Sequence, residues 1–139
     1  MNILFLTMSS GFANIEARGI YTDLMRKFRN EGHEVYIIHP NERRNGRPTE
    51  VKTEGRIHCL GVRTLNVTKT NVVEKGIGQL MLESQFKRAL KKFFGNVKFD
   101  VILYSTPPIT FNKVIKYAKK ASEGRAMTYL LLKDIFPQN

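Results

Sequence analysis

The segment GHEVYIIHP, residues 32–40, decides the fold. Its glycine is typical of a residue that ends a helix, and the contiguous apolar residues 35–38 are typical of a strand covered on both faces. Apolar residues at helical spacing over 20–28 predict an amphipathic helix before it, and NILFLTM, residues 2–8, predicts an earlier strand. Strand, helix and strand in this order predict a right-handed βαβ unit.

The rest of the chain repeats this alternation. Further strands are predicted at 56–62, 99–105 and 126–132. A long helix is predicted over 77–94, with its apolar stripe formed by Leu82, Phe86, Leu90 and Phe93, and another helix begins after Thr110. The polar segment 41–56 is interpreted as a surface loop or a weak hairpin. This spacing predicts an α/β fold: one domain over 1–139, a Rossmann-like three-layer sandwich with a mostly parallel sheet and helices on both faces.

Composition and charge narrow the possible classes. The 139 residues are 42% hydrophobic and 25% charged, as in a globular protein. The apolar runs are too short to cross a bilayer and no secretory signal is recognised, so we expect a cytoplasmic protein. A net charge of +11 attracts polyanions. Nucleic acid, an anionic membrane surface and a phosphorylated substrate are the candidate partners.

The basic residues gather on the two later helices, where almost no acidic residues interleave them. Most such runs are solvated faces, but an anionic leaflet attracts each cation by about 1 kcal/mol. We therefore expect an anionic partner surface, with peripheral binding at the inner face of the plasma membrane as one form of it. Nucleic acid is not favoured, because Phe12 and Phe136 are the only aromatic residues near the predicted crevice. The residues assigned to the surface are Lys87, Arg88, Lys91, Lys92, Lys113, Lys116 and Lys120, with Lys119 beside them.

Ligands of such sheets bind beyond the carboxyl ends of the strands. After the first strand, Ser9, Ser10 and Gly11 are small enough to let backbone N–H groups approach a phosphate, although a connection without a ligand fits equally well. After the fourth strand, Ser105 and Thr106 could hydrogen-bond a sugar or phosphate, or satisfy the local backbone.

Asp134 follows the fifth strand and could act as a general base or cap the next element. No second carboxylate is placed for an acid/base pair. The chain has neither a dinucleotide fingerprint nor a phosphate loop of the nucleotidases, and we expect no cofactor.

Histidine and cysteine patterns indicate no metal site, since no histidine pair has ligand spacing on one helix face. We expect structural roles for His33 and for His58, which is packed or half-exposed in its strand. His39 ends the second strand and could touch a ligand, although a satisfied surface histidine is the favoured interpretation. Cys59 is interpreted as a small buried strand residue.

Four segments also occur in a recognisable order: MNILFLTMSSGF, RGIYTDLMRKFRNEGHEVYIIHP, FDVILYSTPPITF and YLLLKDIFPQN. Together they cover most of the chain. This ordered set resembles the amino-terminal domain of family-4 retaining glycosyltransferases of GT-B architecture, of the bacterial type that builds surface polysaccharides.

The resemblance implies an enzyme of two Rossmann-like domains. The first binds a lipid-linked or saccharide acceptor, and the second binds a nucleotide-sugar donor through an E-x7-E segment that has no counterpart here. The chain would thus be the acceptor-binding domain without its donor-binding domain, inactive by itself. On matching positions, Gly11 and its neighbours, Ser9, Ser10 and Phe12, would face the cleft near the phosphates, and Asp134 would lie near the acceptor. The histidine that many members of this family place in the cleft has no match at a strand end of this sequence. A non-catalytic Rossmann-like module that binds an anionic partner is the alternative.

Overall fold

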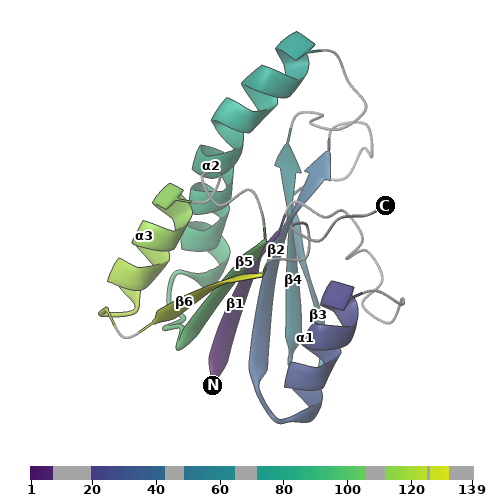
Figure 1. The fold of residues 1–139 in the computed structure, drawn as a ribbon, viewed down its shortest axis with the longest axis vertical. Coiled ribbons are helices and arrows are strands. Elements are labelled where there is room, and N and C mark those ends of the chain that lie inside the picture. The colour runs from purple at the N-terminus through teal and green to yellow at the C-terminus, as the bar shows by residue number, and fades with distance from the viewer. Residues whose placement is uncertain (8–19, 43–48, 65–71, 106–111, 125, 132–139) are drawn as a thin grey trace.

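A computed structural model of the chain describes residues 1–7, 20–42, 49–64, 72–105, 112–124 and 126–131. Strands and helices alternate along most of these residues (Figure 1). In chain order the elements are β1 (Asn2–Leu6), α1 (Ile20–Asn30), β2 (Glu34–Glu42), β3 (Glu50–Glu54), β4 (Ile57–Thr64), α2 (Val72–Phe94), β5 (Val101–Ser105), α3 (Asn112–Ala121) and β6 (Met127–Leu131).

The strands form one sheet in the order β3-β4-β2-β1-β5-β6. The five strands β4, β2, β1, β5 and β6 are each parallel to their neighbours in this row, and β3 pairs with β4 in antiparallel register. The parallel strands follow the Rossmann-like arrangement, in which the chain runs outward from β1 first in one direction and then in the other. The predicted fold class is therefore confirmed.

Helices cover both faces of the sheet, with α1 on one face and α2 and α3 on the other (Figure 1). Alternate side chains of β1 point to opposite faces. Phe5 packs in the core beneath α1 with Met25, whereas Leu4 packs beneath α2 and α3 with Phe86 and Val114. Two apolar cores, separated by the sheet, hold the three layers together.

The end of α1 has the geometry of a Schellman cap. The N–H of Gly32 donates to the carbonyl of Arg29 at 3.0 Å, and the N–H of His33 donates to the carbonyl of Phe28 at 3.1 Å. Gly32 has a φ of 90°, a conformation that a side chain would strain. The predicted helix stop at this glycine is confirmed.

One interpretation of the polar segment 41–56, the weak hairpin, is confirmed: β3 forms a hairpin with β4 around Gly55, at φ 61°. Two predictions about α2 need correction. Phe93 was expected on the buried stripe of α2, but it is 37% exposed. Phe94 is 6% exposed and takes that place, because it lies one turn beyond buried Leu90. The helix also begins at Val72, earlier than predicted.

Candidate functional site

The carboxyl ends of β1, β5 and β6 lie side by side. Leu6 pairs with Tyr104 of β5, and Ser105 pairs with Leu131 of β6. On its other side Leu6 pairs with Ile38 of β2. Because these strands are parallel, the segments that follow β1, β5 and β6 leave the sheet at one edge, from adjacent positions. This is the place where the strand order reverses and where ligands of open α/β sheets bind.

The predicted crevice residues belong to these departing segments. Ser105 is the last residue of β5, and only its backbone is described. The other predicted residues lie outside the described part of the chain, so their roles stay predictions: Ser9, Ser10, Gly11, Phe12, Thr106 and Asp134.

Two buried polar residues do lie at this edge. Thr7 follows β1, is fully buried, and donates its backbone N–H to the carbonyl of Ile38 at 3.1 Å. His39 is 6% exposed, and its Nδ1 atom lies 3.3 Å from the carbonyl oxygen of Pro40. The expectation of a surface histidine was wrong, because β2 continues past Ile38 to Glu42 along β4, and His39 pairs there with Gly61. Sequence reasoning did not single out Thr7, although a hydroxyl directly after four apolar strand residues marks the strand end.

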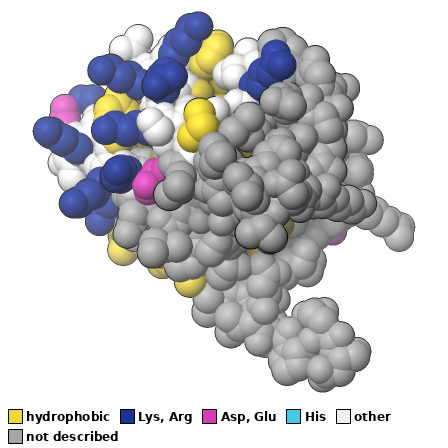
Figure 2. Space-filling model, turned by 90° about the horizontal axis from the view of Figure 1, so that it is seen from above, with side chains coloured by type: hydrophobic (Ala, Val, Ile, Leu, Met, Phe, Trp, Pro, Cys, Tyr) yellow, Lys and Arg dark blue, Asp and Glu magenta, His cyan; other side chains and the backbone are white. Residues whose placement is uncertain are grey.

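The basic residues of α2 and α3 form a second feature, the α2–α3 basic face. Figure 2 shows lysine and arginine side chains gathered on the side where these helices lie, with few acidic side chains between them. Glu83 of α2 accepts a hydrogen bond from the backbone N–H of Lys113 at 2.5 Å and so ties the two helices together. The predicted exposure is confirmed for every residue of the face: Lys87, Arg88, Lys91, Lys92, Lys113, Lys116 and Lys120. Lys119 is half-buried.

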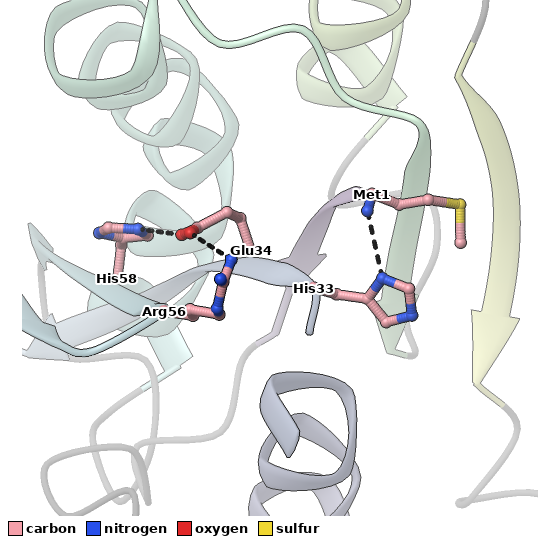
Figure 3. A network of polar contacts seen from close by, with 5 residues as sticks. All are labelled: Met1, His33, Glu34, Arg56 and His58. Atoms are coloured by element: carbon pink, nitrogen blue, oxygen red, sulfur yellow. Dashed lines mark hydrogen bonds and ion pairs between the residues drawn. The ribbon is translucent and has the colours of Figure 1, made fainter. Parts of the chain in front are cut away.

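A polar network at the opposite, amino edge of the sheet is drawn in Figure 3. Glu34, the first residue of β2, accepts hydrogen bonds from His58 Nε2 at 2.9 Å and from Arg56 at 3.2 Å. The His58 ring stacks on Tyr36, and its Nδ1 lies 3.1 Å from the hydroxyl of Thr53. Burial raises the pKa of Tyr36, and the charge of Glu34 adds to the rise. His58 is half-buried and packed, as predicted.

The same edge holds His33, whose Nδ1 lies 3.2 Å from the terminal amine of Met1 (Figure 3). This network lies at the end of the sheet away from the carboxyl ends of the parallel strands. Its contacts join β2, β3 and β4, so we assign it to the stability of the sheet.

Cys59 is a buried free thiol, as predicted. Burial raises its pKa to about 11, the charge of Glu54 adds to this, and Lys52 opposes it. A thiol that stays protonated at neutral pH is a poor nucleophile. Within the described residues, no three His, Cys, Asp or Glu side chains gather in a way that could hold a metal ion. Nor is any described helix long and apolar enough to cross a membrane.

Comparison with known proteins extends only to the fold. No family model and no curated protein matches the chain. Among solved structures, the chain is similar to the C-terminal domain (residues 78–226) of a hydrogenase from Pyrococcus furiosus, with a TM-score of 0.53 and 10% sequence identity. The similarity covers 94% of this chain and 90% of that domain. At this identity it shows a shared α/β fold and nothing about activity.

Proposed function

We propose that this chain is the acceptor-binding domain of a hexosyltransferase that acts in surface-polysaccharide synthesis. Its acceptor would be a lipid-linked or polysaccharide glycan, and a second domain would hold the nucleotide-sugar donor. The order of sequence segments that resembles family-4 glycosyltransferases supports this proposal. The resemblance implies that the segments with Gly11 and Asp134 face one cleft, and the position of Ser105 and Thr106 at the end of a strand adds a third segment.

The observation that carries the proposal is the pairing of β1 with β5 and of β5 with β6. It brings the segments after Leu6, Ser105 and Leu131 to one edge of the sheet. Backbone N–H groups of the first segment would bind phosphate, and hydroxyls of the second would bind sugar. Asp134 in the third would orient or deprotonate the acceptor hydroxyl.

A transfer assay tests the proposal. The chain alone, with a uridine-diphosphate sugar and a polyprenyl-diphosphate glycan, should give no transfer, and addition of a donor-binding domain of the same architecture should produce it. Asp134→Asn should then lower the rate by about 100-fold or more. Glu54→Gln, which removes an exposed carboxylate from the edge strand β3, is the matched control. Sugar transfer by the chain without a donor-binding domain would contradict the proposal.

The α2–α3 basic face supports a second role, the binding of an anionic membrane surface. Its lysines and arginines are exposed on two neighbouring helices, and the acidic Glu83 is engaged with the backbone of α3. Such a face would hold the domain on the inner face of the plasma membrane, where a lipid-linked acceptor is found. This role is also compatible with a non-catalytic module.

A further inference from the structure

A cavity of about 250 Å³ lies between α2 and the strand β4, and we call it the α2–β4 cavity. One stripe of α2 lines it, at the helical spacing that puts side chains on a common face. Val62 of β4 forms part of the opposite wall. The residues of the α2 stripe are Gln85, Arg88, Ala89, Lys92 and Phe93.

The charge around the cavity is positive. Arg88 and Lys92 come from α2, and Arg63 is the second-last residue of β4. Among the described residues that line the cavity there is no carboxylate. Arginine and lysine at one small concavity favour an anion, and the planar guanidinium is suited to bidentate contact with a phosphate or carboxylate.

The uncharged lining residues restrict the ligand further. Val62 and Ala89 are buried and apolar, whereas Phe93 is partly exposed beside them. The buried Oε1 atom of Gln85 has no hydrogen-bond partner among the described residues. Such an atom calls for a donor, from water or from a ligand. Thr49 Oγ1 accepts from the backbone N–H of Arg63 at 2.9 Å, which leaves its hydroxyl hydrogen to donate.

We propose that the α2–β4 cavity binds a small phosphate monoester of a polyhydroxylated molecule, such as a hexose phosphate. The phosphate contacts Arg88 and Lys92. The side-chain amide of Gln85 turns toward the cavity, and its Oε1 atom accepts a hydrogen bond from a ligand hydroxyl. The apolar face of the sugar ring packs on Phe93. The volume is below the roughly 300–1,000 Å³ of pockets for drug-sized ligands, so the ligand is small.

This site is separate from the carboxyl-edge crevice. In the sheet, β2 stands between β4 and β1, and the strands that define the crevice lie beyond it. The proposal therefore does not depend on the transferase assignment. It also divides the α2–α3 basic face, because Arg88 and Lys92 line the cavity while Lys91 and Lys116 do not.

Calorimetric titration of the full chain with glucose 6-phosphate, inorganic phosphate and glucose tests the proposal. We expect one molecule of glucose 6-phosphate to bind per chain, more tightly than inorganic phosphate, and glucose to give no heat of binding. The double variant R88Q/K92Q should weaken glucose 6-phosphate binding by about tenfold or more, because it removes two charge-assisted contacts. Gln85→Leu should narrow the preference for glucose 6-phosphate over phosphate.

The matched control is K91Q/K116Q, which removes the same charge from the same two-helix face outside the cavity. It should change the affinity by less than about threefold, as expected for screened surface charges. Equal weakening by both double variants would overturn the proposal in favour of a diffuse field. Absence of binding by the unaltered chain would overturn it as well. Amide spectra of each variant, compared with those of the unaltered chain, verify that the fold is kept.

Discussion

The Nζ atom of Lys87 lies 5.8 Å from the centre of the Tyr117 ring, so a cation–π contact joins α2 to α3. The next residue, Arg88, lines the α2–β4 cavity on another side of the helix. Lys91 of α2 and Lys116 of α3 are exposed and are not among the residues that line the cavity. The α2–α3 basic face thus divides into a cation packed on Tyr117, cations at the cavity and cations that face solvent.

The membrane-binding role predicts salt-dependent binding to anionic vesicles. K113Q/K116Q should weaken binding to phosphatidylglycerol vesicles by about 30-fold at low salt, since each cation contributes about 1 kcal/mol. The control K27Q/K52Q removes equal charge from α1 and β3 and should change binding little. Co-sedimentation at low and high salt measures both. Binding that ignores salt, or equal losses in the two variants, would argue against this role.

Phe86 carries much of the packing between α2 and the sheet, because its side chain is fully buried. Phe86→Ala should lower the free energy of unfolding by about 3–5 kcal/mol, through lost burial and a residual cavity. Phe93→Ala removes the same ring from a 37% exposed position and should cost clearly less. Urea denaturation of the two variants measures the difference. Similar losses of unfolding free energy would contradict the burial of Phe86 and the exposure of Phe93.

Gly32 closes α1 at a φ of 90° with open space around it. Gly32→Ala should therefore destabilise the fold by about 1–2 kcal/mol through backbone strain alone. Gly32→Asn should destabilise it less, because asparagine tolerates positive φ better than alanine. Thermal or urea unfolding can rank the three chains. An alanine variant as stable as the original would contradict the cap geometry.

Hydrophobic periodicity predicted the order of the elements because each one buries a distinct face. Residues 35–38 predicted a strand covered on both sides, and β2 is the third strand from an edge of the sheet. The strand β3 was not predicted firmly, because EVKTE is polar and is held by hydrogen bonds to β4 at an edge.

The candidate sites were predictable to different degrees. The exposure of Lys87 and Lys113 follows from helical spacing, which the sequence shows directly. The α2–β4 cavity brings Thr49 and Arg63 together with Gln85, which lies far from both in the sequence, and no local pattern indicates such a long-range contact. The burial of His39 likewise depends on how far β2 extends along β4.

Cys59 should react slowly with thiol reagents in the folded chain, because its buried thiol has a pKa raised to about 11. An unfolded cysteine titrates nearer 9, so the folded state holds this proton more tightly. The resulting stability is complete below pH 9 and is lost as the pH rises toward 11. Cys59→Ala should lack this part of the pH dependence. Rapid labelling at pH 8 without unfolding would contradict the burial.

Titration of the ¹⁵N-labelled chain with a short-chain polyprenyl-diphosphate glycan locates the acceptor site. We predict saturable shifts of the backbone amides of Thr7, Tyr104 and Leu131, at the edge where β1, β5 and β6 end. The amides of Lys52 and Thr53, in the far edge strand β3, should stay unchanged. Shifts confined to the α2–β4 cavity or to the network around His58, or no saturable shifts, would contradict an acceptor site at the carboxyl edge.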